Sequence, residues 1–292
     1  MSTPSSAQKK PWSDIKVKPE VPANKVTFED IKRMIEERRK APRAAGTCAV
    51  FYGERGTGKT GAALDCRTPK EIKDGKKVFI IDVDGNAKWT ADEYWGEDEN
   101  VILIDPIRAE EDGSLKDQET YDYIRATVAY SKSIQNELKC IIFDGLDRFL
   151  KICEDLMKEK YLHIPIGERV SAFDWGIRNT LNNNPLYLMN TMRCMRIYIT
   201  HMKVPMQLVQ GRLVELEPRP DFQRLFPNSV IQEVFFTKEE NDGRTILKAK
   251  VKKSNTRLSL EGAEFIVGTN SKAEGAKWYG LKEMYTALGD FE

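Results

Sequence analysis

Along the chain, apolar residues gather in short, nearly continuous runs that end in polar or acidic residues. Five such runs precede residue 202, over 47–52, 76–85, 101–106, 140–145 and 196–201. Runs of this kind are typical of strands buried on both faces of a parallel sheet. Because amphipathic stretches separate them, we predict an α/β fold with a mainly parallel central sheet flanked by helices.

The stretches between these runs predict the helices. An apolar stripe of helical period follows Thr27, which forms a capping-box variant with Asp30, and it extends to about Lys40. A proline in a helix interior removes a hydrogen bond, so Pro185 is expected to break or restart the helix around it. The further helices are expected over about 117–136, 148–162, 172–195 and 280–288.

The C-terminal third of the chain changes to shorter segments. A hairpin or mobile loop is expected over 204–220, and an antiparallel extension of the sheet follows, with strands over 230–237, 245–253 and 264–267. Lys248, Lys250 and Lys252 alternate with apolar residues, which predicts a half-buried edge strand with a lysine face. That face either protects the edge by its charge or contacts nucleic acid or a phosphate bound by a neighbouring subunit.

One segment has a specific chemical signature. Residues 53–60 read Gly-Glu-Arg-Gly-Thr-Gly-Lys-Thr and fit the phosphate-binding loop G-x-x-x-x-G-K-[ST] at every fixed position. Its glycines let backbone N–H groups turn inward around nucleotide phosphates, while Lys59 reaches the β- and γ-phosphates and the Thr60 hydroxyl ligates Mg²⁺. The predicted nucleotide-binding residues are Gly53, Glu54, Arg55, Gly56, Thr57, Gly58, Lys59, Thr60 and Gly61.

The surroundings of this loop agree with the motif. It follows a predicted strand, and the small residues after Thr60 let a helix begin close to the phosphates with its positive end toward them. That helix must be short, because Pro69 lies nine residues after Thr60 and bars its continuation. The predicted ligands are ATP and Mg²⁺.

An acidic residue at the end of another predicted strand completes the magnesium site begun by Thr60. Residues 140–144, Cys-Ile-Ile-Phe-Asp, have the pattern of a Walker B strand that ends at Asp144. Ligands of open α/β sheets bind at the carboxyl ends of the strands, so Asp144 is expected to hold Mg²⁺ with Thr60, directly or through water. Asp147 is a further acid nearby, for which we favour an N-cap of the next helix.

Composition narrows the class of protein. Charged residues make up 31% of the 292 positions but leave a formal net charge of +1, so the chain is not a uniformly basic nucleic-acid coat. It has no apolar run long enough for a transmembrane helix and no signal-peptide core, so no membrane association is expected. Five scattered cysteines and two histidines favour no structural zinc, and reduced thiols suit the cytoplasm, that of the host if the protein is viral.

The order of these motifs resembles the RecA-like branch of P-loop ATPases. More narrowly, the chain is similar to phage and archaeal-virus nucleotide-binding proteins of that branch, some of which act in recombination or single-strand annealing. The resemblance implies a single RecA-like ATPase domain over 25–292, with its core at about 47–257, after a tail over 1–24 whose composition predicts disorder. It rests on residues 53–60, 81–85, 141–144, 173–176, 199–201 and 252–257.

The same resemblance implies further site residues. In RecA-like ATPases an acid that ends the strand beside the phosphate-loop strand orients the attacking water, and Asp84 matches that place, although Glu is usual in the recombinases. His201, after Thr200, matches the position that senses the γ-phosphate, or is a hydrogen-bonded histidine at a strand end. Lys253 and Arg257 resemble the segment that reaches a neighbouring subunit's γ-phosphate. The predicted catalytic residues are Lys59, Asp84, Asp144, His201, Lys253 and Arg257.

The leading hypothesis is a P-loop ATPase, weak or stimulated by DNA, that requires Mg²⁺ and assembles as a homo-oligomeric ring or filament. It would act on DNA, with single strands favoured, in recombination or annealing. A viral DNA-packaging or translocating motor has the same motifs and would depend on double-stranded DNA. A nucleotide-gated binding module with little hydrolysis is the third possibility, because Asp84 is shorter than Glu. A small-molecule kinase is least favoured, since no arginine-bearing lid or acceptor pocket can be identified.

Overall fold

The computed structural model describes the chain over 27–40, 47–209, 212–222, 230, 232–255, 258–272, 274–279 and 284–286. Contacts between Cα atoms divide the chain into two compact units, Met1–Arg43 and Ala44–Glu292, and each is described by itself. The tail predicted over 1–24 lies outside the described residues.

The first unit contains helix α1 (Phe28–Lys40), as predicted. Its start is capped reciprocally. Thr27 Oγ1 accepts a hydrogen bond from the Asp30 N–H at 3.1 Å, and Asp30 Oδ2 accepts one from the Thr27 N–H at 3.0 Å. The capping pair read from the sequence is therefore confirmed, since both side chains satisfy N–H groups that a helix leaves unpaired at its start.

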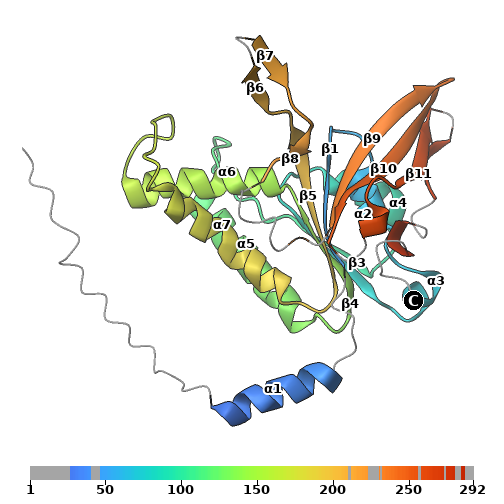
Figure 1. Ribbon diagram of the computed structural model, residues 1–292, viewed down its shortest axis with the longest axis horizontal. Coiled ribbons are helices and arrows are strands. Elements are labelled where there is room, and N and C mark those ends of the chain that lie inside the picture. The colour runs from blue at the N-terminus through green and yellow to red at the C-terminus, as the bar shows by residue number, and fades with distance from the viewer. Residues whose placement is uncertain are drawn as a thin grey trace, which may run out of the picture. The chain divides into compact units, whose positions relative to one another are not determined.

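The second unit is built on a ten-stranded sheet (Figure 1). Its parallel strands, in spatial order, are β9 (Gln232–Asn241), β1 (Cys48–Gly53), β5 (Met195–Lys203), β4 (Leu138–Asp144), β2 (Lys77–Asp82) and β3 (Val101–Ile104). Antiparallel strands extend it beyond β9, namely β10 (Arg244–Ser254), β11 (Glu264–Ser271) and β12 (Gly275–Trp278). The predicted fold class, a mainly parallel sheet with antiparallel C-terminal strands, is confirmed.

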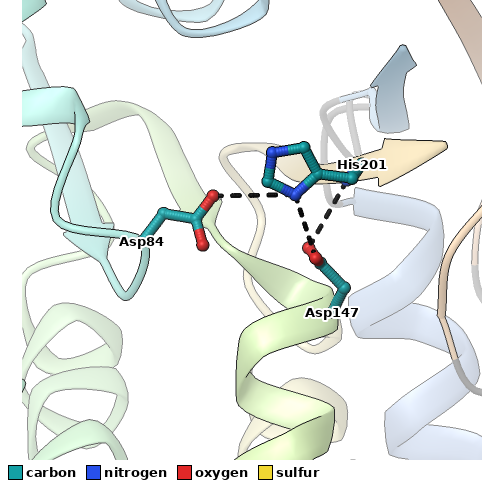
Figure 2. Close-up of side chains that lie close together, drawn as sticks. All are labelled: Asp84, Asp147 and His201. Carbon is teal, nitrogen blue, oxygen red and sulfur yellow. Dashed lines mark hydrogen bonds and ion pairs between the residues drawn. The ribbon is translucent and has the colours of Figure 1, made fainter. Parts of the chain in front are cut away.

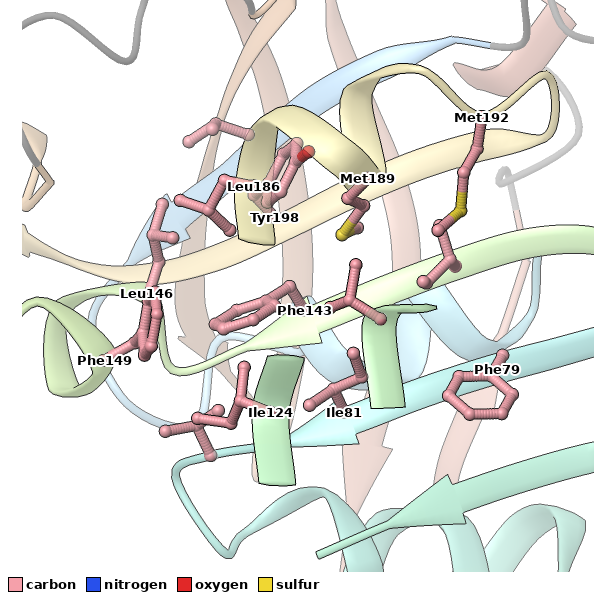
Figure 3. Packing of buried hydrophobic residues seen from close by; sticks show 14 of the residues in the cluster. Phe79, Ile81, Ile124, Phe143, Leu146, Phe149, Leu186, Met189, Met192 and Tyr198 are labelled. Atoms are coloured by element: carbon pink, nitrogen blue, oxygen red, sulfur yellow. The ribbon is translucent and has the colours of Figure 1, made fainter. Parts of the chain in front are cut away.

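Helices cover both faces of the parallel strands (Figure 1). On one face lie α5 (Asp117–Ser133), α6 (Leu146–Leu156) and α7 (Trp175–Asn190), and on the other lie α2 (Lys59–Leu64) and α4 (Ala87–Trp95). Strand β1 shows why both faces are apolar. Its Val50 and Tyr52 join the core under α5, α6 and α7, whereas Ala49 and Phe51 join the core under α2 and α4. Figure 3 shows the first of these cores, with Phe143 of β4 between the helices and the sheet.

Shorter elements connect this framework. Helix α2 ends at Leu64, and α3 (Pro69–Lys73) begins separately with Thr68 in a complete capping box, so the prediction of a short helix before Pro69 is confirmed. Helix α6 begins at Leu146 and continues as a π-helix over Met157–Leu162. A one-turn 3₁₀ helix covers Leu258–Leu260.

The predicted hairpin is present beyond β5. It consists of β6 (Met206–Val209) and β7 (Arg212–Glu215), and the two-residue β8 (Arg219–Pro220) then pairs with β5. Of the helix expected over 280–288, the structure describes residues 284–286, which are helical. No helix in the described ranges is long and apolar enough to cross a membrane.

The break predicted at Pro185 is wrong, because α7 runs through it. A proline at this position cannot donate a hydrogen bond to the carbonyl four residues earlier, that of Leu181. Tyr121 of α5 supplies the missing partner, since its hydroxyl donates to Leu181 O at 3.0 Å. A tertiary contact thus removes the cost on which the prediction rested.

The strand that carries Lys248, Lys250 and Lys252 is β10. It was predicted to lie at the edge of the sheet, but this prediction is wrong, because β10 lies between β9 and β11. Its alternation is confirmed, since Leu247, Ala249 and Val251 are buried. The lysines on its other face pair with glutamates of neighbouring segments, in the pairs Lys248–Glu239, Lys250–Glu264 and Lys252–Glu217. Their charge is therefore largely neutralised within the chain.

Candidate functional site

The phosphate loop connects β1 to α2 at the carboxyl edge of the sheet. Two of its glycines are required by geometry. A side chain on Gly53 would place its Cβ 2.2 Å from Phe236 O of β9, and Gly58, immediately before α2, has a φ of 85°. Only glycine adopts such a conformation without strain, so the fixed glycines of the motif set the path of this loop.

Lys59, the first residue of α2, is folded back over the loop. Its Nζ donates hydrogen bonds to Gly53 O at 3.1 Å and to Glu54 O at 2.6 Å, and its exposed fraction is 8%. Burial lowers the pKa of this ammonium, and the nearby carboxylates of Asp144 and Asp84 oppose that shift. The arrangement holds a desolvated cation inside a loop of glycines, which is the counter-charge that a bound phosphate needs.

Thr60 and Asp144 meet beside the loop, as predicted. The Thr60 hydroxyl donates to Asp144 Oδ2 at 2.8 Å, although the two residues are far apart in the chain. Asp144 is 4% exposed, and burial raises its pKa to about 7, against the lowering effect of the Thr60 hydrogen bond. A hydroxyl and a buried carboxylate, side by side at the end of a strand, form an oxygen donor set that suits Mg²⁺, so these residues fit the ion.

Asp82 is a buried acid whose role the sequence did not reveal. Its carboxylate accepts N–H bonds from Gly85 at 2.8 Å, from Ala87 at 3.0 Å and from Lys88 at 3.2 Å. It therefore fixes the turn after β2 and the start of α4, a helix that was not predicted. This turn carries Asp84 past the end of the strand and toward the phosphate loop.

Asp84, Asp147 and His201 converge next to the loop (Figure 2). His201 Nδ1 lies 2.9 Å from Asp147 Oδ2 and 3.9 Å from Asp84 Oδ2. Burial and the charge of Asp147 raise the pKa of Asp84, whereas His201 lowers it. Donor atoms of all three lie within 4.8 Å of one another, near enough to share a cation, but a hydrogen bond between Asp147 and His201 accounts for the shortest of these distances.

The strand order explains this convergence and corrects one expectation. β5 lies between β1 and β4, so His201 stands opposite Gly53 and beside the Walker B strand, as predicted. The strand that leads to Asp84 does not adjoin the phosphate-loop strand, because β5 and β4 separate β2 from β1. Asp84 reaches the site through its turn, which passes so near Gly145 that a Cβ there would lie 2.8 Å from Asp84 N.

The N-cap role favoured for Asp147 is wrong. Helix α6 begins two residues earlier than that role requires, and its N-cap is Gly145 with a φ of 97°. Asp147 lies in the first turn, where it contacts His201 and also accepts a hydrogen bond from the Thr200 hydroxyl at 3.1 Å. The glycine turn thus releases the carboxylate for a contact with β5.

Lys253, one of the two charges predicted in the C-terminal segment, is not part of this cluster within one chain. Lys253 pairs with Glu233, with 3.7 Å between Nζ and Oε1. Glu233 is level with Val50 in the sheet, three residues before Gly53 at the loop edge. Arg257 lies outside the described residues.

Trp278 of β12 is a contact that no local signal in the sequence indicated. Its ring covers α2 so closely that a Cβ on Gly61 would lie 1.9 Å from Trp278 Cζ2. The ring also packs against Tyr94 and Trp95 of α4, with centroid separations of 6.2 and 6.4 Å. Strand β12 therefore packs closely, through Trp278, against α2, the helix that follows the phosphate loop.

Comparison with known proteins concerns the fold. No protein-family model matches the chain, and no curated protein matches it in sequence. The crystal structure of the RadB recombinase is similar with a TM-score of 0.46 and 14% identity, over 84% of this chain and 96% of that one. A KaiC-like protein from the archaeon Pyrococcus horikoshii OT3 is similar with a TM-score of 0.42 and 14% identity, over 80% of this chain and 89% of that one.

Proposed function

We propose that the protein is a Mg²⁺-dependent ATPase of the RecA-like type. One observation carries the proposal: the Thr60 hydroxyl and the buried Asp144 carboxylate are joined at 2.8 Å beside a phosphate loop that holds Lys59 inside it. When bound, Mg²⁺ would neutralise charge on the β- and γ-phosphates and fix their geometry. Thr60 and Asp144 would hold the ion, and Lys59 would exchange its carbonyl partners for phosphate oxygens.

The remaining groups are suited to the attack by water. Asp84 would accept a hydrogen bond from the attacking water and orient it, and the nearby His201 would sense the γ-phosphate. A phosphoryl transfer site works mainly by positioning and electrostatics, so these roles require fixed side chains rather than covalent chemistry. Lys253 or Arg257 of a neighbouring subunit would complete the charge around the γ-phosphate.

Substitution of Lys59 tests the ATPase proposal. Lys59→Ala should reduce turnover by about 100-fold or more, the usual effect of removing a group that stabilises transition-state charge. Lys77→Ala is the matched control. Lys77 is the first residue of β2, at the end of the strand opposite the site, where it pairs with Glu137, so its loss should leave turnover unchanged. ATP binding and hydrolysis are measured with and without Mg²⁺. Tight ATP binding with full turnover in Lys59→Ala would overturn the site assignment.

We further propose, from the motif order, that the protein acts on DNA as a ring or filament, with single strands favoured. ATPase rates without DNA, with single-stranded DNA and with double-stranded DNA test this, with the assembly's mass measured in parallel. Single-stranded DNA should raise the rate, and binding should weaken as salt increases. A lack of binding at low salt would remove DNA from the proposal. An ATPase rate that depends on double-stranded DNA, in a protein that forms a closed ring, would instead favour a packaging or translocating motor. Tight ATP binding without single-turnover hydrolysis would favour a nucleotide-gated binding module.

A further inference from the structure

His201 has contacts at both ring nitrogens, and the chemistry of these contacts selects the tautomer of the neutral ring. Arg55 Nε of the phosphate loop donates to His201 Nε2 across 3.4 Å. A guanidinium carries donors and no acceptor, so Nε2 must present a lone pair. In the neutral ring the proton is then on Nδ1, which donates to Asp147 Oδ2 at 2.9 Å. The hydrogen bonds therefore select the Nδ1–H tautomer.

Asp147 also holds the strand end that carries the ring. Its Oδ1 accepts from the His201 N–H at 3.4 Å and from the Thr200 hydroxyl at 3.1 Å, although that hydroxyl shares its proton with Asp221 O at 2.7 Å. The carboxylate thus binds both the backbone and the imidazole of one residue, from the first turn of α6.

Asp84 is the competitor for the same imidazole proton. Its Oδ2 lies 3.9 Å from His201 Nδ1, beyond hydrogen-bond distance. Without the charge of Asp147, the proton on Nδ1 would lose its acceptor, so the ring would pass at least partly to the Nε2–H tautomer. Any ring that kept its Nδ1–H would turn it toward Asp84 and occupy a carboxylate oxygen that should face the attacking water. The ring would also lose the orientation that directs Nε2 to Arg55.

We propose that Asp147 is a positioning residue, which keeps His201 in the Nδ1–H tautomer with Nε2 directed at Arg55 and leaves Asp84 available to water. Its effect on turnover rests on the ATPase function proposed above. Its effect on the imidazole does not, so the two can fail separately. Asp147 would produce both effects, on the imidazole and on turnover, through His201 and not by contact with the nucleotide.

The tautomer is measurable directly because the chain has two histidines, His163 and His201. Imidazole ¹⁵N spectra at pH 8, with His163→Gln for assignment, should show His201 protonated on Nδ1. In Asp147→Asn the protonated nitrogen should shift partly or wholly to Nε2. A wild-type ring protonated on Nε2, or a tautomer unchanged by the substitution, would overturn the proposal whether or not the protein hydrolyses ATP.

Kinetics of a double-mutant cycle test the consequence. Asp147→Asn should lower kcat about 10- to 100-fold with little change in KM for ATP, as for other residues that orient a functional histidine. Asp147→Asn combined with His201→Gln should be no slower than His201→Gln alone. Asp155→Asn, on the same helix and paired with Lys151, is the matched control and should keep full activity. Losses that multiply in the double variant, or an equal loss in the control, would show that Asp147 does not act through His201.

Discussion

Gly61→Ala should reveal how tightly the C-terminal strand is fastened to the phosphate-loop helix. An alanine Cβ at this position would lie 1.9, 2.2 and 2.7 Å from three ring carbons of Trp278. Carbon atoms in contact are about 3.5–4.0 Å apart, so the ring or the helix would have to move by roughly 1.6 Å. Tyr94 and Trp95 pack against the same ring and restrict its escape.

The magnitude combines two opposing effects. Overpacking of this kind costs about 1–3 kcal/mol. Replacing a helical glycine by alanine stabilises the protein by about 0.5–1 kcal/mol. The net result for Gly61→Ala is a destabilisation of up to about 2.5 kcal/mol in the free energy of unfolding. In a Trp278→Ala background the clash is absent, so the same substitution should be neutral or stabilising.

Urea unfolding of the four proteins in this cycle measures the effect, with unchanged m-values as the check that the unfolded states are comparable. We expect a coupling free energy of about 1–3 kcal/mol, the overpacking contribution. Gly176→Ala is the control, because Gly176 lies in α7 with nothing within 4 Å of its added Cβ. Equal effects of Gly61→Ala in both backgrounds, within about 0.5 kcal/mol, would refute the contact with Trp278.

Two further substitutions test charges outside the site. Burial and the nearby Asp155 and Glu159 raise the pKa of Asp117 to about 6, so the folded protein binds a proton that the unfolded chain releases above about pH 4. The free energy of unfolding therefore falls as the pH rises from about 4 to about 6. Asp117→Asn should be more stable than wild type at pH 7.5 but equal to it near pH 4. Urea titrations at each pH measure the difference. A pH-independent difference would contradict this. Asp98→Ala should cost about 3 kcal/mol, because it leaves the guanidinium of Arg67, whose side chain is 2% exposed, without its ionic partner. A urea midpoint equal to wild type would contradict that reasoning.

Local chemistry was sufficient for the main elements and for the centre of the candidate site. The phosphate loop was predictable because its glycines, lysine and threonine are adjacent and their spacing alone implies a backbone path. Asp144 was predictable because it ends an apolar strand, and parallel strands bring such ends to one edge of the sheet. The capping pair Thr27 and Asp30 is local in the same sense.

The tertiary structure decided the features that depend on which elements become neighbours. Pro185 does not break α7, because the hydroxyl of Tyr121, in another helix, donates to the Leu181 carbonyl that the proline cannot bond. The lysine strand is internal, because β11 pairs with its other side, which its own alternation could not indicate.

The role of Asp147 shows this division most clearly. Its sequence position, three residues after Asp144, is that of a helix cap. Its contact with His201 at 2.9 Å depends on Gly145, which starts α6 two residues earlier than a cap at Asp147 would, and on β5, which lies between β1 and β4. The sequence alone determined the phosphate loop and the strand ends, because their geometry follows from neighbouring residues. Which side chains lie beside the loop and the strand ends was decided by the order of the strands and by helix packing. Strand order and packing depend on contacts between segments far apart in the sequence.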